Sequence, residues 1–515
     1  MNRYLTRILS LAFLTIAVTT KGVGCLDSCD YEANSRSYLA VRPHFQSASP
    51  EMVSAFRYDR THARESGKHS AIQFVAFGSK STNNDELARY FLSCAKTSLV
   101  VASADSIASG VEADLLTQHF NVFTQTGNYH SEISLCPKQS VVGFALHGRK
   151  SFCRNEENDR GFWASASIPI ERVKNRMNLR ETVFDDGNGI DETQDENVVA
   201  NMIEAFNQEE WNSCRIACGS LDKTGVADIE LKLGYEWLSH DPCHLESYIG
   251  LIAPAGNKPC GKYLWSPVVG NGNHFGIMTG GGFGVQIWEH EDGDRNLRVE
   301  FESNTRYLFS EKTCRCLDLK CKPLSRYIEV YKDLEEATAA SNLTPSTLAT
   351  NFATPGVNVL TLPVKVTPGF SHNMNTALVY GSEKFQAELG YNLYCRQSEC
   401  VKLAHAFQEV AAIKARDGAG QTNTVRDITG NTQLEDLDIA LASYTNSLIK
   451  ESDLDLVSAA TPCGISHTVY ASFGFKCDDR EYPLFVNVGG SYERGKATNG
   501  MVDRWTAWAK AGLSL

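Results

Sequence analysis

Charged side chains recur at every second position in several segments of the sequence, a spacing that puts them on one face of a β-strand. In residues 296–309 one parity carries Arg298, Glu300, Glu302 and Arg306. The opposite parity is apolar and ends in aromatic residues: Leu297, Val299, Phe301, Tyr307 and Phe309. Carboxylates and guanidinium groups that face an aqueous passage can select solutes by charge and size. The pattern therefore predicts a polar passage whose wall is apolar on its outer side.

The same alternation in neighbouring segments predicts eleven pore-lining residues: Asp228, Glu230, Lys232, Glu236, Arg298, Glu300, Glu302, Arg306, Lys384, Glu388 and Arg396. Lys476, Glu493 and Lys510 lie on the equivalent parity of later segments. Together these side chains carry as many acids as bases, so they favour neither anions nor cations. In an alternative interpretation, the charges pair across strands and only hold the wall together.

Strands long enough to carry these faces are typical of a transmembrane β-barrel, whose outside meets lipid and whose inside meets water. Fifteen segments show strand periodicity, near residues 69–78, 118–127, 139–148, 160–171, 225–238, 243–253, 274–288, 296–310, 324–332, 356–367, 373–381, 384–397, 464–477, 482–494 and 502–515. Single-chain bacterial barrels carry even strand numbers, and 324–332 can instead open a helix. We therefore predict an all-β fold, an antiparallel barrel of about 14 strands within a range of 12 to 16.

A few short helices are also expected, in loops or in the lumen, because a helix cannot replace a strand in a barrel wall. Apolar residues recur at helical spacing in residues 85–96, 196–214 and 400–416. The long polar insertions near 172–222 and 414–462 suit extracellular loops, which are the longer ones in such barrels.

The first residues read as a secretory signal. Arg3 and Arg7 precede an apolar run at 8–18, and Gly22 and Gly24 are small residues before a cleavage point. An acylated Cys25 is an alternative that stays open. The expected organisation is a signal peptide, an N-terminal periplasmic or plug segment, and a transmembrane β-barrel, with the bounds 1–24, 25–68 and 69–515.

The chain contains 16 cysteines, and in an exported protein a disulfide framework is the natural interpretation. The candidates are Cys25, Cys29, Cys214, Cys218, Cys314, Cys316, Cys321, Cys395, Cys400, Cys463 and Cys477. Zinc is the weaker alternative, because no paired Cys-x-x-Cys spacing is present in the sequence. The pairing cannot be read from sequence.

Two motifs suggest other chemistry, and each has a plainer interpretation. The glycine run at 270–284 resembles a phosphate loop, but it sits inside a strand pattern, where a bent strand or close backbone approach is favoured. Residues 240–244 resemble a metal cluster but carry turn chemistry. We expect no catalytic residues, no metal and no cofactor, and the protein is not expected to be an enzyme.

The signal sequence, the alternating strands and the apolar final strand at 502–515 together resemble Gram-negative outer-membrane β-barrel proteins. More narrowly, four stretches are similar to an uncharacterised group of porin-like proteins from intracellular bacteria: residues 42–47, 325–327, 388–392 and 505–515. The resemblance covers nearly the whole chain and implies no catalytic residues. It departs from such barrels at Leu515, where a final Phe is usual.

These observations predict a porin-like channel for small solutes in the bacterial outer membrane. A surface-exposed barrel with a plugged lumen, acting as an adhesin or host-interaction protein, is the first alternative. An exported, soluble, disulfide-rich β protein is the second. The expected partners are outer-membrane lipid and small solutes, with a homo-oligomer as an option. A net charge of −12 without a Lys/Arg cluster argues against nucleic acid.

Overall fold

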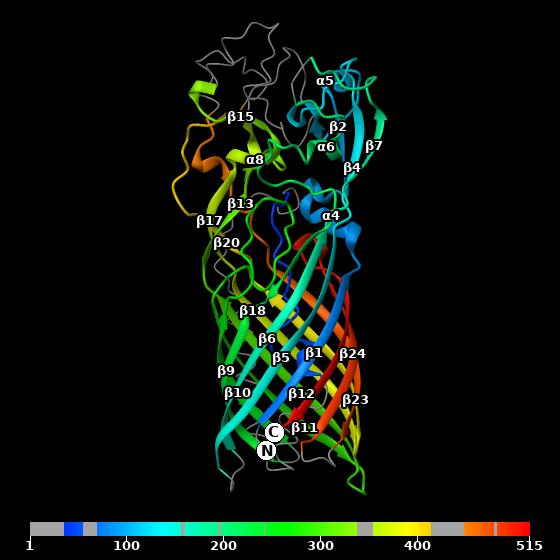
Figure 1. The fold of residues 1–515 in the computed structure, drawn as a ribbon, viewed down its shortest axis with the longest axis vertical. Coiled ribbons are helices and arrows are strands. Elements are labelled where there is room, and N and C mark those ends of the chain that lie inside the picture. The colour runs from blue at the N-terminus through cyan, green and yellow to red at the C-terminus, as the bar shows by residue number, and fades with distance from the viewer. Residues whose placement is uncertain are drawn as a thin grey trace.

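A β-barrel closed by twelve antiparallel strands forms the body of the molecule (Figure 1). The computed structural model describes residues 35–54, 70–155, 160–193, 197–240, 243–336, 354–413, 448–477 and 482–515. In order around the wall the strands are β1 (Ser70–Ser81), β5 (Lys138–Asn155), β6 (Arg160–Arg176), β9 (Ile229–His240), β10 (Cys243–Ala253), β11 (Gly276–Glu289), β12 (Arg295–Leu308), β18 (Gly369–Ser382), β19 (Phe385–Arg396), β23 (Gly464–Cys477), β24 (Leu484–Gly495) and β25 (Arg504–Ser514).

The first and last strands of the barrel pair with each other and close the ring. β1 and β25 run antiparallel from the Ala71–Ser514 pair to the Ser81–Arg504 pair. One further strand, β8 (Leu221–Val226), pairs with the upper part of β6, directly before β9 in the chain. Closure removes the unpaired edges that an open sheet of this size would leave.

The predicted all-β fold is confirmed, and the strand number lies at the lower end of the predicted range. Twelve of the fifteen predicted segments form the wall, while 118–127, 324–332 and 356–367 do not. These three contain η2 (Thr117–Phe120), η3 (Ser325–Tyr327), β15 (Glu329–Tyr331), α8 (Gly356–Val359) and β17 (Thr361–Thr367). Their apolar residues pack in a separate core above the barrel. Alternating apolar residues therefore occur in these segments although none of their faces is in contact with lipid.

The helical predictions hold only in part. Residues 85–96 contain α4 (Asn84–Phe91), but 196–214 contain only the single turn of α6 (Met202–Ala205). Residues 400–416 begin instead with β20 (Cys400–Leu403), which pairs with β17. This pairing with a distant strand overrides the local helical spacing. No helix in the described part of the chain is long and apolar enough to cross a membrane.

The connections at the two ends of the barrel differ in length. At the end where the first and last barrel strands begin and finish, neighbouring strands are joined by short links, such as the one between β18 and β19. At the opposite end, long connections fold into a cap (Figure 1). The cap includes three small sheets, β3-β2-β4-β7, β13-β17-β20 and β16-β15-β21. Their remaining members are β2 (Ser98–Ala102), β3 (Leu115–Leu116), β4 (His130–Ser134), β7 (Arg180–Asp185), β13 (Glu311–Cys316), β16 (Thr354–Pro355) and β21 (Ala412–Ile413).

The smaller elements of the described chain are α2 (Pro50–Val53), which lies in the lumen, and six short elements of the cap and its junctions with the barrel. These six are η1 (Ser93–Ala95), α5 (Ala104–Ala108), β14 (Asp318–Leu319), η6 (Glu451–Asp453), β22 (Leu454–Asp455) and η7 (Ala497–Asn499). The cap has its own apolar core, in which Phe120, Phe206, Trp211 and Tyr327 pack ring against ring.

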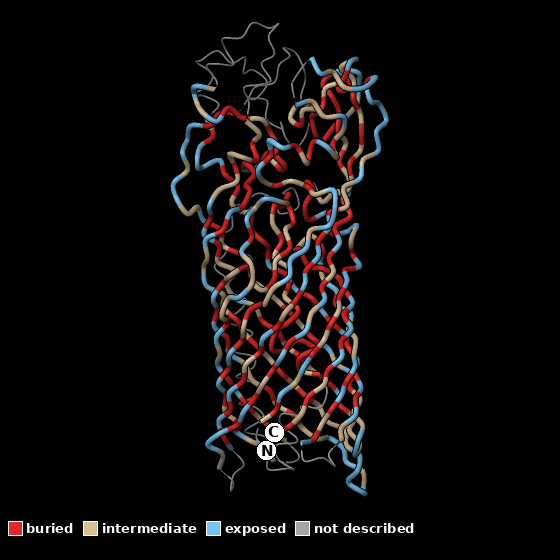
Figure 2. Tube along the Cα trace, viewed as in Figure 1, coloured by how far each residue is buried: buried red, intermediate tan, exposed pale blue. Residues whose placement is uncertain are grey.

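Wall strands alternate between buried residues that face inward and exposed residues that face outward, as Figure 2 shows along the barrel. In β23 the alternation is nearly unbroken over twelve positions. Many large apolar residues of the wall are exposed: Ile72, Phe74, Phe144, Leu146, Leu231, Leu233, Ile249, Leu251, Leu389, Val469, Phe473, Val486 and Val488. An apolar surface this extensive is typical of a membrane-contacting protein rather than of a soluble monomer.

Aromatic rings lie outside this apolar band near both ends of the strands. Toward the cap, Tyr307 contacts Phe370 at 4.8 Å between ring centroids, and Trp505 is exposed. At the opposite end, Tyr235 contacts Phe162 at 4.8 Å and Trp237 at 4.7 Å. Two such girdles mark the two interfaces of a membrane.

Candidate functional site

The lumen of the barrel holds a stretch of the chain's own N-terminal region, residues 35–54. This lumen segment is the dark-blue trace inside the barrel in Figure 1. Its first residues contact the cap and its last residues contact the lower half of β25, through Ser35 and Ser54 respectively. Most of the segment is buried, including its polar residues Arg42, His44 and Gln46. The predicted 25–68 region therefore has a described part inside the barrel, while the rest lies outside the described residues.

The centre of the contact between segment and wall is a cluster of charges around Glu493. Arg42 Nη1 donates to Glu493 Oε1 at 3.1 Å, and Arg504 Nε donates to Glu493 Oε2 at 2.8 Å. Arg42 Nη2 also donates to the side-chain oxygens of Asn392 and Asn373, at 2.9 and 3.2 Å. Buried ion pairs offset their desolvation cost only when such additional hydrogen bonds are present. This cluster therefore fixes the segment at one position in the lumen.

Arg504 of β25 also holds the following residues of the segment, up to His44. Arg504 Nη1 lies 2.8 Å from His44 Nε2 and 3.1 Å from the Arg42 carbonyl oxygen. The His44 ring stacks on Phe77 of β1 with 5.5 Å between centroids. Because Arg504 is always protonated, His44 Nε2 must accept this hydrogen bond.

Two further contacts hold the lower part of the segment. Ser47 donates to Glu230, which also pairs with Arg306. Lys510 Nζ donates to the carbonyl oxygens of Met52 and Ser54, at 2.9 and 2.7 Å. The ammonium group thus satisfies backbone acceptors that have no sheet partner there.

At the cap end, Arg36 and Tyr38 hold the beginning of the segment. Arg36 Nη1 donates to the carbonyl oxygens of Val457 and Ala460, at 2.5 and 2.9 Å. The guanidinium carbon of Arg315 lies 3.3 Å from the centre of the Tyr38 ring. The segment is thus held at its cap end, in the middle and at its lower end.

Below this segment, a second charge cluster joins three wall strands. Arg149 Nη2 of β5 donates to Glu236 of β9 at 2.8 Å and to Glu246 of β10 at 3.0 Å. The same guanidinium group lies 4.0 Å from the centre of the Trp163 ring. Arg149 and Glu246 were not among the predicted lining residues. Glu246 lies on the inward parity of the predicted strand 243–253, and Arg149 lies one residue beyond the predicted segment 139–148, because β5 continues to Asn155.

Arg149→Ala should lower the free energy of unfolding by about 3–5 kcal/mol, because it leaves two buried carboxylates without this cation. The measurement is the urea midpoint of the purified barrel. Lys258→Ala is the matched control, since the Lys258–Glu311 pair at 2.6 Å lies at the surface and should change stability by less than about 1 kcal/mol. Equal midpoints for the two variants would contradict the assignment.

Most of the predicted lining residues lie inside the barrel. The buried ones are Asp228, Glu230, Lys232, Glu236, Glu300, Glu302, Arg306 and Glu388, and Arg298 and Arg396 are partly buried. Lys384 does not line the lumen: it lies exposed in the turn between β18 and β19, one residue before β19 begins. Its parity was right, but the strand ends before its side chain can face inward.

Contacts with other side chains account for much of this charge. Arg306 of β12 pairs with Glu230 of β9 across the lumen, and Glu300 Oε2 lies 3.3 Å from His244 Nε2 of β10. Glu300 Oε1 also lies 3.2 Å from Arg298 Nη2 of its own strand. Glu388 accepts from the Tyr470 hydroxyl at 2.8 Å. The predicted alternative, in which charges hold the wall together, is therefore realised at these positions.

Three other predicted residues make different contacts. Asp228 accepts from the Asn271 backbone N–H at 2.7 Å and so holds the β10–β11 connection against the lumen. Lys232 lies with its ammonium 5.0 Å from the centre of the Tyr248 ring. Arg396 donates to the carbonyl oxygens of Ala40 and Asn499 and joins the segment to the cap.

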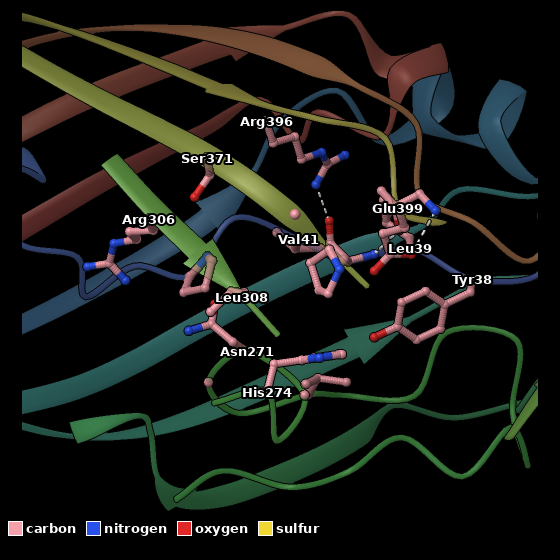
Figure 3. A pocket seen from close by; sticks show the side chains of 18 of the residues that line it. Tyr38, Leu39, Val41, Asn271, His274, Arg306, Leu308, Ser371, Arg396 and Glu399 are labelled. Carbon is pink, nitrogen blue, oxygen red and sulfur yellow. Dashed lines mark hydrogen bonds between the residues drawn. The ribbon is translucent and has the colours of Figure 1, made fainter. Parts of the chain in front are cut away.

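Two cavities lie along the segment, one at each end. The upper one encloses about 870 Å³ of space, part of it open to solvent, between the segment, the β10–β11 connection and the ends of β12, β18 and β19 (Figure 3). Tyr38, His274, Ser371 and Arg396 line it. The lower one encloses about 500 Å³ beside Met52 and is lined mostly by polar side chains, among them His147, Arg149, Lys232, Glu246, Glu302 and Lys510.

The glycine run at 270–284 lies mainly in β11, as the close-approach interpretation predicted. A Cβ atom at Gly280 would lie 2.5 Å from the Tyr248 ring of β10, so a side chain there would displace the tyrosine. No group of three or more His, Cys, Asp or Glu side chains in the described ranges is placed to hold a metal ion.

The cysteine expectations have mixed outcomes. Cys321 is disulfide-bonded, whereas Cys25 and Cys29 lie outside the described residues and Cys400 begins β20. Seven candidates carry thiols: Cys214, Cys218, Cys314, Cys316, Cys395, Cys463 and Cys477.

The structure excludes a disulfide between Cys463 and Cys477, two of the candidate cysteines. Cys463 and Cys477 bracket the 14-residue strand β23. At about 3.3 Å per residue this strand separates them by about 46 Å, whereas a disulfide needs Cα atoms within about 7 Å. These two residues therefore cannot pair with each other.

No protein-family model and no curated protein matches the sequence. Among solved structures, the chain is similar to an outer-membrane channel from Pseudomonas putida F1, with a TM-score of 0.37 and 8% identity over 87% of this chain and 95% of the other. It is also similar to the transport unit of the autotransporter AIDA-I from Escherichia coli, with a TM-score of 0.35 and 7% identity over 86% and 89%. A FadL homologue from Pseudomonas aeruginosa gives a TM-score of 0.27 and 8% identity over 86% and 89%. Likeness at this level carries no argument about function.

Proposed function

We propose that this protein is a bacterial outer-membrane β-barrel that acts as a porin-like channel for small solutes and is closed at rest by residues 35–54. The membrane location is supported by the apolar outer band between two aromatic girdles. The orientation is supported by the loops, since barrels of this class carry short turns on the periplasmic side and long loops outside. The cap then lies at the cell surface.

The observation that carries the channel is the pair of cavities along the lumen segment. Along its length the segment contacts the wall through ion pairs and hydrogen bonds, such as those of Arg42 and Lys510, and through the apolar packing of Phe45 and Met52. Polar contacts of this kind can be exchanged for contacts with water when the segment moves. A segment packed by apolar side chains alone would have no such exchange available.

Solutes that suit this path are small and polar. The lumen carries both signs of charge on its wall, for example Lys232 of β9 and Glu302 of β12 beside the lower cavity. Mixed charge disfavours large apolar molecules without selecting one sign of ion. No enzymatic activity is part of this proposal.

The test is conductance of the purified barrel in planar lipid bilayers. We expect long closed periods with occasional stepwise openings, because the segment occupies the lumen in the resting structure. Folding is checked on the same sample by heat-modifiable electrophoretic mobility. Folded barrels that stay electrically silent, both as the intact protein and with the segment's contacts weakened, would overturn the channel.

A second function, binding to another cell surface, is favoured by one observation on the cap. The strand β7 ends the sheet β3-β2-β4-β7 and exposes Val183 and Phe184, which are 42% and 59% exposed. Exposed aromatic residues at a sheet edge are common anchors of protein interfaces.

If the cap binds such a partner, Phe184→Ser should lower binding of the protein-bearing bacteria to host cells at least tenfold. Phe152→Ser, at an exposed position of the wall near its other end, is the control and should leave binding unchanged. Unchanged binding in Phe184→Ser would remove this second function.

A further inference from the structure

Two cysteines from distant parts of the chain meet inside the cap. Cys214 lies in the connection between α6 and β8, and Cys316 is the last residue of β13. Both are buried, with 1% and 3% of their surface exposed, in the apolar core of the cap. Each stands as a thiol in the structure.

The backbone brings the two residues together in this core. Cys214 N–H donates to the Gly261 carbonyl oxygen at 2.9 Å, and a Cβ atom on Gly261 would lie 3.3 Å from Thr361, which is the strand partner of Cys316. The side chain of Cys214 is also held from a second side, because Tyr327 Oη lies 3.9 Å from Cys214 Sγ and donates to the Cys214 carbonyl oxygen at 3.2 Å. Two buried thiols on adjoining backbone segments are placed to form a disulfide with little backbone movement.

The electrostatics of the pair make its members unequal. The hydrogen bond from Cys316 and the nearby Arg326 guanidinium lower the pKa of Cys214. Burial and the hydrogen bond to Cys214 raise the pKa of Cys316 well above the usual range for a thiol. Since a thiolate is the attacking species in disulfide exchange, Cys214 is the member that reacts first.

We propose that Cys214 and Cys316 form a disulfide in the mature protein. The oxidant is a disulfide-bearing thiol oxidoreductase of the compartment through which the chain is exported, so the proposal rests on the outer-membrane location proposed above. Both thiols are buried in the folded cap, so the exchange takes place while the cap folds. The Cys214 thiolate attacks the oxidant's disulfide and releases one oxidant thiol. The Cys316 thiolate then attacks the mixed disulfide and releases the second. Two protons and two electrons leave the protein, and one S–S bond forms.

This pairing differs from the neighbouring pairs that the sequence suggests. Cys218 and Cys314 are exposed rather than in the cap core, and Cys321 is already disulfide-bonded. The bond would join the β6–β8 connection to the β12–β18 connection, two loops that rise from different parts of the barrel. A cross-link of this kind limits the freedom of the unfolded cap.

Non-reduced peptide mapping tests the pairing without ambiguity. Protein from the outer-membrane fraction is denatured in excess alkylating reagent at acidic pH and then digested with trypsin. Cleavage after Arg180 and Arg215 gives a peptide whose one cysteine is Cys214, and cleavage after Arg315 and Lys320 gives one whose one cysteine is Cys316. We expect these two peptides as a single cross-linked species that reduction separates.

Variants separate this result from other outcomes. Cys214→Ser should remove the cross-linked species and leave Cys316 alkylated, whereas Cys218→Ser should leave the species intact. Recovery of both peptides as alkylated thiols, or cross-linked to another cysteine, would overturn the proposal. Fractionation of the same cells tests the membrane location separately. Absence of the protein from the outer-membrane fraction would contradict the proposed function, whatever the state of the two cysteines.

Discussion

Arg42→Ala should raise the ratio of open to closed time in planar bilayers by about 10- to 100-fold. The substitution removes three hydrogen bonds between the lumen segment and the wall, one of them to the Glu493 carboxylate. The expected change counts only the bond between two charged groups, Arg42 and Glu493, which contributes about 1.5–3 kcal/mol, and about 1.4 kcal/mol corresponds to a factor of ten. Glu493 keeps its pair with Arg504, so the wall itself should stay folded.

The control for this experiment is Arg172→Ala. Arg172 forms an exposed pair with Asp222 at 3.0 Å and does not contact the segment, so its removal should leave the closed times unchanged. Lys510→Ala tests the same idea at another position, because it removes the hydrogen bonds that hold the lower end of the segment to β25. If both Arg42→Ala and Lys510→Ala fold and remain as closed as the unmodified protein, the segment is not the closing element.

The two-residue period of the strands made the wall predictable from the sequence. A strand with one polar and one apolar face can be recognised locally, and β12 carries its inward charges at Arg298, Glu300, Glu302 and Arg306 as expected. The missed residues Arg149 and Glu246 show the same signal, with alternating apolar neighbours in β5 and β10. Strand ends are less visible, as Lys384 shows, because the turn and not the parity decides the side chain's direction.

The lumen segment and the cap could not be predicted in the same way. The segment around Arg42 and His44 has no strand or helix period, and its structure depends on partners such as Glu493 and Arg504 that lie more than 400 residues away in sequence. The core of the cap brings together residues from six connections between wall strands, including Cys214 and Cys316. Contacts at such separations leave no local pattern in the chain.

Leu389→Arg should prevent stable assembly of the barrel in the membrane. Leu389 lies near the middle of β19 on the outward face, is 65% exposed, and has apolar outward neighbours such as Val469. An arginine near the middle of the bilayer costs about 2–4 kcal/mol in barrels of this class, a large part of the 5–15 kcal/mol typical of a folded protein. The measurement is the fraction of heat-modifiable barrel in lipid vesicles and its urea midpoint.

Val183→Arg is the matched control, because it places the same side chain at an exposed apolar position of the cap, on β7, outside the proposed membrane band. In water the arginine pays no desolvation cost, so assembly and the urea midpoint should stay close to those of the unmodified protein. A loss confined to Leu389→Arg places lipid against β19. If both variants assemble equally well, the outward band does not contact lipid. That result would favour the alternative that the chain is an exported, soluble β protein.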